Sequence, residues 1–442
     1  MTSLLPQFSF TGLTLLSFFV ALMVIVFVHE MGHYLAGRWS GIKADVFSIG
    51  FGPVLWRRVD RRGTVWQIAL VPLGGYVKFK GDSNAASMGA DAGAGASRDS
   101  MAGAPVWARA LTVASGPAFN FIFAFLVFAW AVLSVGVATD PLTLASVPNL
   151  PDTYEQELET GDQILAIGGI ETPTIADVVA ATDKIPMVPS VDYRVGRAGE
   201  EIVVRGPYPE PTLALTVSSD SPAREAGLLA DDVITAIDGT PVFAFSQMMD
   251  IVAASEGQEM TFEVWRQGET LSFDIAPRRV DLPLWDGDFE TRWLIGLSGG
   301  LFFEPQTSSP DVATTLRYAW GQLWYIAKVS VSGMWHMLTG EISTCNLSSP
   351  VGIAQTSGEM AAQGIGTYIQ FLGLLSTAIG LLNLFPIPIL DGGHLVFHAY
   401  EAVSGRKPSE SALRILTMIG LALILMMMFL AVANDTVPGL CP

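Results

Sequence analysis

The sequence predicts a polytopic α-helical membrane protein: four transmembrane helices, a loop with β-structure between the first two, and a folded acidic module between the second and third. Half of the 442 residues are hydrophobic and 15% are charged, whereas soluble domains carry about a quarter charged residues. Four long apolar stretches contain no Asp, Glu, Lys or Arg. Acidic residues are concentrated in one block, with 28 Asp and Glu against 9 Lys and Arg from Thr139 to Gly300.

The four apolar stretches are each long enough to cross a hydrocarbon layer of about 30 Å. No basic residue precedes the first and no small-residue cleavage pattern follows it, so we expect a retained helix rather than a signal peptide. Val312–Leu338 is apolar in places but contains Arg317, Lys328 and His336, which predicts an amphipathic helix lying on the membrane. The predicted spans are Phe10–Val28, Ala110–Ala138, Tyr368–Leu390 and Ile415–Ala433.

The distribution of Lys and Arg in the short loops predicts the orientation of the chain. Nine lie in the loop Tyr34–Pro105, three more precede the fourth span, and residues 1–9 and the tail from Asn434 have none. We therefore expect the basic loops in the cytoplasm, and both termini and the acidic block on the outer side. The net charge of −18 argues against a nucleic-acid partner, and the lipid bilayer is an expected one.

The segment His29-Glu30-Met31-Gly32-His33 is an H-E-x-x-H motif at the end of the first predicted helix. On a helix, His29 and His33 share one face and can bind one metal ion through two imidazoles. Glu30 can act as general base toward a water that zinc makes acidic. Because such polar groups are costly at the end of a membrane helix, a functional role is favoured over a structural polar cluster.

A catalytic zinc site needs a third protein ligand and an open position for water. Asp391, in the segment that ends the third predicted span, is the acidic residue closest to the bilayer there. His394 and His398 are alternatives on general chemistry. With four spans, Asp391 returns to the membrane side that carries His29, whereas a fifth crossing at Val312–Leu338 would place it on the opposite side.

Two segments of the acidic block repeat one pattern: Glu159–Ile170 and Gly227–Pro241. Each combines acidic residues after a glycine, an alternating apolar strand, a glycine turn and a following helix-like run. They resemble two tandem PDZ-like α+β domains. Such domains often capture C-terminal peptides by strand addition. The family resemblance described next implies a second role, exclusion of bulky substrates by size, and the sequence leaves both roles open.

Taken together, the motifs resemble the site-2 protease family of intramembrane zinc proteases, and within it the regulator-of-sigma-E protease type. Besides H-E-x-x-H, the resemblance rests on Asn383–His394, which carries an N-x-x-P-x-P-x-L-D-G-G-H pattern, and on Ser115–Asn120, Gly50–Pro53 and Pro72–Lys78. The last two match a membrane-associated β-hairpin region on the cytoplasmic side.

The resemblance implies His29, His33 and Asp391 as ligands of one Zn²⁺ ion and Glu30 as the catalytic acid-base. It also implies substrate-binding roles for an extended peptide segment near the metal. The residues expected to bind substrate are Asn383, Pro386 and Pro388, and, in the β region, Gly74, Gly75 and Tyr76.

The resemblance further implies a multi-pass protein of the bacterial inner membrane, with the PDZ-like domains in the periplasm and the active site near the cytoplasmic side. Its expected substrate is a single-span, anti-sigma-factor-like protein already cut on the outer side, with remnant signal peptides as further substrates. The alternative is a non-catalytic receptor or adaptor built around the PDZ-like domains. The intact Glu30 argues against that alternative, and the near absence of charge in the spans argues against a zinc transporter.

The two cysteines, Cys345 and Cys441, exclude a disulfide-built scaffold and could be paired or free. Ser83–Pro105 is rich in Ala, Gly and Ser and is expected to be a flexible linker. The expected organisation is 1–37, first transmembrane helix; 38–105, cytoplasmic loop with hairpin and linker; 106–138, second transmembrane helix; 139–211 and 212–281, PDZ-like domains; 282–367, connecting segment with the amphipathic helix; 368–392, third transmembrane helix; 412–434, fourth transmembrane helix.

Overall fold

The computed structural model describes residues 4–81, 97–218, 221–284 and 286–437. The chain divides into two compact units. The first holds residues 1–131 and 313–441, together with 285–287. The second holds residues 132–284 and 288–312.

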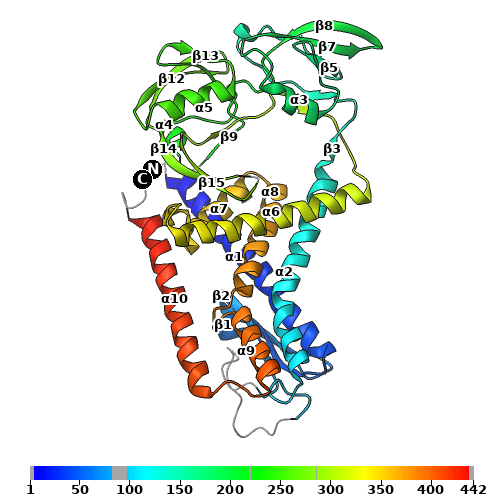
Figure 1. Ribbon diagram of the computed structural model, residues 1–442, viewed down its shortest axis with the longest axis vertical. Helices are drawn as coiled ribbons and strands as arrows, with labels where there is room; N and C mark the ends of the chain where they lie inside the picture. Colours follow the sequence, from blue (N-terminus) through cyan, green and yellow to red (C-terminus); the bar gives the residue numbers. More distant parts are fainter. Residues whose placement is uncertain (1–3, 82–96, 219–220, 285, 438–442) are drawn as a thin grey trace. The chain divides into compact units, whose positions relative to one another are not determined.

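The first unit is a helical bundle with one β-hairpin (Figure 1). Four helices of its described part are long and apolar enough to cross a membrane, as expected: residues 12–39 of α1, all of α2, all of α8 and all of α10. The helices are α1 Leu4–Trp39, α2 Val106–Val135, α6 Val312–Thr339, α7 Pro350–Ala362, α8 Ile365–Leu384, α9 Asp391–Ser404 and α10 Glu410–Thr436.

Two of these helices bear directly on the sequence expectations. The structure makes Val312–Thr339 a single helix, α6, which runs across the direction of α2 and α10 (Figure 1) and is not among the four candidate spans of the described residues. The third expected span differs: the helix stops at Leu384, and Asp391 begins a separate helix. Prolines at 386 and 388 lack the N–H that a continuing helix would need, which explains the break.

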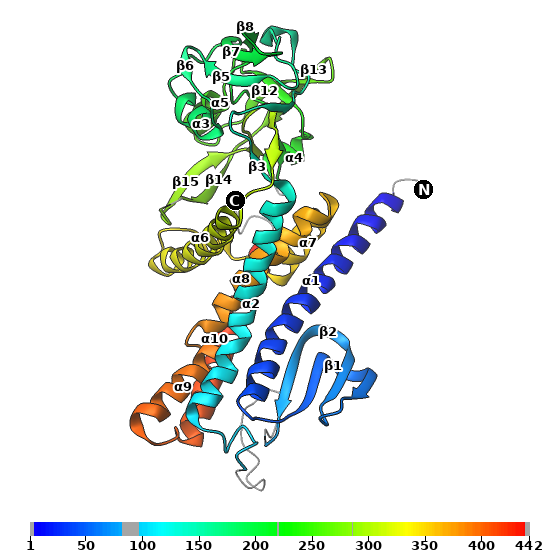
Figure 2. The same cartoon turned by 90° about the vertical axis from the view of Figure 1, so that its right-hand side faces the viewer.

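The hairpin consists of β1 Ala44–Val59 and β2 Val65–Phe79, paired antiparallel with several register shifts. Figure 2 shows it beside α1, which runs alongside α2. Tyr34, Phe47, Val77 and Phe79 are buried together where the hairpin meets α1 and the start of α2. The two segments expected in a β-hairpin region both lie in this hairpin, Gly50–Pro53 in β1 and Pro72–Lys78 in β2. Much of the expected linker, and Cys441, fall outside the described residues, while Cys345 is not a free thiol.

The second unit contains two four-stranded antiparallel sheets, ordered β6-β5-β7-β8 and β11-β10-β12-β13. Helices α3 Ile175–Thr182, α4 Pro222–Ala226 and α5 Phe245–Ala254 accompany them. The strands are β3 Val137–Ala138, β4 Leu144–Ser146, β5 Gln163–Ile167, β6 Ile170–Glu171, β7 Val191–Arg197, β8 Glu200–Gly206, β9 Thr216–Val217, β10 Val233–Ile237, β11 Thr240–Pro241, β12 Met260–Arg266, β13 Glu269–Ile275, β14 Arg278–Pro283, β15 Phe289–Leu294, β16 Leu297–Ser298, β17 Glu304–Pro305 and β18 Thr307–Ser308.

The two sheets repeat one local design. Arg197 forms two hydrogen bonds of 2.7 Å to the buried Asp162 carboxylate, and Arg266 forms bonds of 2.6 and 2.7 Å to the buried Asp232 carboxylate. In each case one carboxylate oxygen also accepts from the backbone three residues earlier. The matching geometry explains the repeated acidic pattern of the sequence.

Residues after the second sheet return to this unit. β16 pairs with β9, β17 with β4, and β18 with β3. The segment 289–308 therefore belongs to the second unit, whereas the sequence predicts a connecting segment over residues 282–367.

Candidate metal centre

Helix α1 brings the two motif histidines together. His29 and His33 lie one turn apart, with ring centroids separated by 4.7 Å and ring planes at 88°. Their Nε2 atoms are 3.2 Å apart. Both imidazoles therefore present the same type of nitrogen to one point.

Asp391, the first residue of α9, completes the group. Its Oδ2 lies 3.1 Å from Nε2 of His29 and 3.4 Å from Nε2 of His33. In the described part of the chain this is the one group of three or more His, Cys, Asp or Glu residues spaced to hold a metal. Of the three candidates for the third ligand, the structure brings Asp391, not His394 or His398, to the two histidines.

The spacing fits a tetrahedral metal ion. Zinc bound at about 2.0–2.1 Å from each ligand atom would set those atoms roughly 3.3 Å apart, close to the three observed separations. Oδ2 of Asp391 is buried and accepts no hydrogen bond from any described residue. A carboxylate oxygen facing the lone pairs of two neutral imidazoles in this way is unfavourable unless a cation lies among them. Three protein ligands leave the fourth position open, as in catalytic zinc sites.

Helix α2 orients both histidines. Nδ1 of His33 donates to the backbone oxygen of Thr112 at 2.8 Å, which leaves the Nε2 lone pair for a metal. The side-chain amide of Asn120 lies 3.3 Å from Nδ1 of His29, and its buried Oδ1 has no hydrogen-bond partner among the described residues. An amide with its oxygen turned toward His29 accepts the Nδ1 proton and satisfies both groups.

Close approach of α2 depends on glycine. A Cβ atom on Gly116 would lie 2.4 Å from the His33 ring and 2.9 Å from the His29 ring. A Cβ on Gly32 of α1 would lie 2.2 Å from the backbone oxygen of Ser115. Neither position accommodates a side chain without moving the helices or the imidazoles apart.

Glu30 lies on α1 next to the first histidine and packs against β2. A Cβ placed on Gly75 would be 3.4 Å from Cγ of Glu30. The structure therefore places the expected acid-base group between the metal residues of α1 and the expected substrate-binding strand.

The expected β-region residues lie together in β2. The Tyr76 ring stacks on Phe51 at 6.0 Å, and Gly74 leaves room for that Phe51 ring. Gly75 pairs with Ile49 of β1. Residues 65–68 of β2 are paired on both edges, by residues 46–49 and by residues 56–59 of β1. Residues 75–79 of β2 pair only with residues 44–49, so among the described strands none pairs with the second edge of this part of β2.

The remaining expected substrate-binding residues shape the break between α8 and α9. Nδ2 of Asn383 donates to the backbone oxygen of Ile379 in its own helix at 3.1 Å. Pro388 packs against α10, where a Cβ on Gly420 would be 3.1 Å from the proline ring. Pro386 is exposed. These contacts explain how the chain turns before Asp391, and a substrate-binding role for the three residues stays a prediction.

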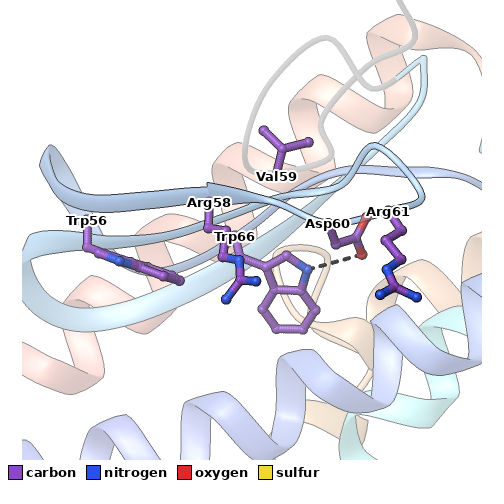
Figure 3. A pocket seen from close by; sticks show the side chains of 6 residues that line it. All are labelled: Trp56, Arg58, Val59, Asp60, Arg61 and Trp66. Atoms are coloured by element: carbon purple, nitrogen blue, oxygen red, sulfur yellow. Dashed lines mark hydrogen bonds between the residues drawn. The ribbon is translucent and has the colours of Figure 1, made fainter.

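A hollow at the tip of the hairpin is separate from this centre (Figure 3). It is lined by Trp56, Arg58, Val59, Asp60, Arg61 and Trp66. Asp60 accepts hydrogen bonds from Nε1 of Trp66 at 3.3 Å and from Oη of Tyr34 at 3.2 Å. The hollow contains none of the metal-centre residues, and Asp60 holds the hairpin turn against α1.

Sequence reasoning identified the three clustered residues but not their supports. The Thr112 carbonyl carries no sequence signal, because any residue has one. Asn120 and Gly116 belong to the Ser115–Asn120 motif, for which no role in supporting the histidines was expected. Their spacing of four residues, which puts them on one helix face, is the signal that was available.

Two imidazoles and a carboxylate around one point, a glutamate beside them and helices apolar enough to span a membrane define a membrane-embedded metallohydrolase. The family model for peptidase family M50 matches residues 17–427. A protein of Agrobacterium fabrum provisionally named a zinc metalloprotease is 34% identical, over 95% of this chain and 94% of its own. The regulator of sigma-E protease RseP of Escherichia coli and that of Salmonella typhimurium are each 33% identical, over 95% of this chain and 98% of theirs.

The chain belongs to peptidase family M50 and is a zinc metalloprotease. The resemblance to the site-2 proteases is thereby confirmed.

Proposed function

We propose that this protein is an intramembrane endopeptidase that hydrolyses a peptide bond in or beside the transmembrane segment of single-span membrane proteins. The observation that carries the proposal is the convergence of His29, His33 and Asp391 next to Glu30, on helices that are apolar enough to span a bilayer. A hydrolytic centre on such helices can reach bonds that a soluble protease cannot.

In this proposal His29, His33 and Asp391 hold the zinc ion. When bound, zinc lowers the pKa of water and polarises a carbonyl group. Glu30 removes a proton from the attacking water and delivers it to the nitrogen of the departing amine, so that the scissile C–N bond breaks and no proton is left over. Thr112 and Asn120 keep both imidazoles in the tautomer that leaves Nε2 free.

The substrate must be extended before hydrolysis, because a helical peptide bond is covered by its own hydrogen bonds and side chains. The second edge of residues 75–79 of β2 supports such a role. An extended peptide added there would form main-chain hydrogen bonds beside Gly75, where an added Cβ would lie 3.4 Å from Cγ of Glu30. We assign Gly74, Gly75 and Tyr76 to this strand addition. Asn383, Pro386 and Pro388 would border the substrate segment from the opposite part of the chain.

The distribution of Lys and Arg supports a cytoplasmic position for the metal centre and an outer position for both termini and the acidic unit. The names of the relatives that regulate sigma-E support an anti-sigma-factor-like substrate in a bacterial inner membrane. Such a substrate would first be cut on the outer side, and remnant signal peptides are further candidates. Cleavage would release the cytoplasmic fragment.

The two repeated sheets support the assignment of tandem PDZ-like domains. Capture of a C-terminal tail and exclusion of bulky substrates make opposite predictions. Under tail capture, one change at the substrate's C-terminal residue stops cleavage. Under size exclusion, removing the module lets untrimmed substrate be cut.

The test of the proposed activity is Glu30→Gln, assayed with a model single-span substrate in lipid. We expect the variant to retain zinc, because both histidines and Asp391 are untouched, and to leave the substrate intact. Cleavage by Glu30→Gln at the wild-type rate would remove Glu30 from the mechanism. A wild-type protein that holds zinc but cuts only soluble peptides would exclude the intramembrane activity.

A further inference from the structure

A buried ion pair joins the helix that orients the histidines to the helix that begins with Asp391. The guanidinium of Arg109 on α2 makes two hydrogen bonds of 2.8 Å to the two carboxylate oxygens of Glu401 on α9. The side chains of Arg109 and Glu401 are 10% and 13% exposed. Nε of Arg109 also donates to the backbone oxygen of Ala104 at 3.1 Å, so the guanidinium is held on both sides.

Arg109 lies on the face of α2 that serves the metal centre. Residues 109, 112, 116 and 120 are spaced by three, four and four positions, which places them along one stripe of a helix. Three of these contact the histidines: the Thr112 carbonyl binds His33, Gly116 leaves room for both rings, and Asn120 lies against His29. The fourth, Arg109, contacts α9.

The position of Asp391 depends on the orientation of helix α9, because Asp391 is its first residue. The helix is separated from α8 by the non-helical residues 385–390, so α8 cannot fix its rotation through a continuous backbone. At its start, Gly392 and Gly393 pack against backbone oxygens of that break, where an added Cβ would approach to 2.2 and 2.4 Å. Farther along, Glu401 ties α9 to α2 through two parallel hydrogen bonds, a geometry that fixes direction as well as distance.

We propose that Arg109 and Glu401 are a positioning pair for the metal centre: they fix α9 against the same face of α2 that orients His29 and His33, and so hold Asp391 at the distance a zinc ion requires. The inference rests on the proposed metal site. Neither residue touches substrate or metal. Their effect reaches the metal through the rotation of α9.

The test measures zinc release rather than activity. The full-length protein, purified in lipid nanodiscs and loaded with zinc, is mixed with a coloured chelator in excess, and the rate of zinc transfer is recorded together with the melting temperature. Glu401→Gln keeps the shape but loses the charge. The double variant Arg109→Met/Glu401→Met removes both charges, so that neither charge is left buried without its partner. Replacing a buried ion pair by apolar residues in this way often preserves stability. Arg109→Lys keeps the charge but loses the two-pronged geometry.

A matched control breaks another interhelical contact of the same unit. Asp435 of α10 accepts hydrogen bonds from the backbone of Ser349 and Gly352 at the start of α7, at 2.9 and 3.3 Å. Neither of these helices carries a metal ligand. Asp435→Asn is expected to lower the melting temperature without changing the rate of zinc release.

We expect zinc release to become about tenfold faster in Glu401→Gln and in the double Met variant. Loss of groups that support metal ligands typically weakens metal binding about 10- to 100-fold, and this expectation is at the lower end of that range. The double variant should melt close to the wild type, and Arg109→Lys should release zinc at an intermediate rate. A double variant that melts like the wild type and releases zinc within about twofold of its rate would overturn the proposal. If the double variant does not fold, wild-type release by a folded Arg109→Lys would overturn it.

The same experiment separates this failure from failure of the metal site. A wild-type protein that binds no zinc, or an Asp391→Asn variant that releases it at the wild-type rate, would contradict the proposed ligands themselves. If the wild type binds zinc and Asp391→Asn releases it quickly, the proposed ligands are supported. The variants of Arg109 and Glu401 then test the positioning pair alone.

Discussion

The imidazoles of His29 and His33 are oriented by groups that lie on the neighbouring helix. Each ring uses Nε2 toward Asp391 and Nδ1 toward α2. The two nitrogens of each ring therefore differ in how well they can be predicted. The sequence predicts the pair of metal-binding histidines, but it does not predict the groups on α2 that contact their Nδ1 atoms. A spacing of four residues on one helix is a local property. The partner of a ring nitrogen on another helix depends on tertiary packing.

Gly116→Ala should release the metal by displacing the His33 ring. The added methyl would lie 2.4 Å from ring atoms that are held in place by the Thr112 carbonyl. We expect zinc affinity to fall about 10- to 100-fold, as for other losses of ligand support, measured by competition with a chelator. Gly321→Ala in α6 is the control, because a Cβ there meets nothing within 4 Å; equal losses from both variants would contradict the argument.

Substitutions of Asn120 test which end of its amide faces His29. Asn120→Asp presents only oxygens, which can accept the Nδ1 proton, and should keep zinc bound at least as tightly as the wild type. Asn120→Leu removes the acceptor and should weaken zinc binding about tenfold or more. Isothermal titration with zinc on the metal-free protein distinguishes the two. If Asn120→Asp bound zinc more weakly than Asn120→Leu, the amide nitrogen rather than the amide oxygen of Asn120 would face the His29 ring.

At the scale of elements, the break between α8 and α9 determines where the third ligand lies. The sequence identifies Asp391 and predicts a third span that continues to Leu390, whereas the helix ends at Leu384. The sequence does not show that a new helix starts at Asp391. Hydropathy alone does not distinguish an apolar helix that ends several residues before Asp391 from one that continues up to it. The glycines after Asp391 pack against backbone oxygens of the break, and that packing is also a tertiary property.

The Asp162–Arg197 pair should make the first sheet of the second unit sensitive to acid. Burial raises the pKa of Asp162, but hydrogen bonds from Arg197 and from the backbone of Glu159 outweigh burial and lower the pKa below its usual value. The ionised carboxylate therefore stabilises the folded state above the ordinary aspartate pKa of about 3.9, and this stabilisation is lost as the pH falls through the lower pKa of the folded state.

Hydrogen exchange of residues 159–167 in the intact protein measures this effect. At pH 7, Asp162→Asn should lower the free energy of local unfolding by about 2 kcal/mol, the worth of hydrogen bonds to a charged group. The difference from the wild type should stay constant to about pH 5 and shrink below about pH 4. A difference that grows with acidification would contradict the assigned sign.

At the scale of the whole molecule, the chain separates a helical unit that contains every metal-centre residue from a β-rich unit with two repeated sheets. Hydropathy predicted the four helices of the described residues that are long and apolar enough to span a membrane, and the repeated acidic pattern predicted the repeated design of the second unit. The return of residues 289–308 was not predictable. Its strands β16, β17 and β18 have two residues each, too few for a periodic pattern, and they pair with strands far away in the sequence.

The return of residues 289–308 decides how the second unit should be removed. Deleting only residues 139–281 would leave β16 and β17 without their partners β9 and β4, so the informative deletion is 137–308 with a flexible Gly/Ser replacement. We expect this variant to retain zinc, because all ligands and supports lie in the first unit. Its action on untrimmed and trimmed substrate then separates size exclusion from tail capture. Loss of zinc from the variant would show that the metal centre requires the module.

The most direct test of the metal centre is the zinc content of the purified protein, measured by mass spectrometry of the metal in wild type, Glu30→Gln, His33→Asn and Asp391→Asn after identical dialysis against a weak chelator. The account predicts about one zinc per chain in the wild type and in Glu30→Gln, and a strong reduction in the other two. Full zinc retention by Asp391→Asn, with the histidine variant depleted, would show that the carboxylate at the start of α9 is not a ligand.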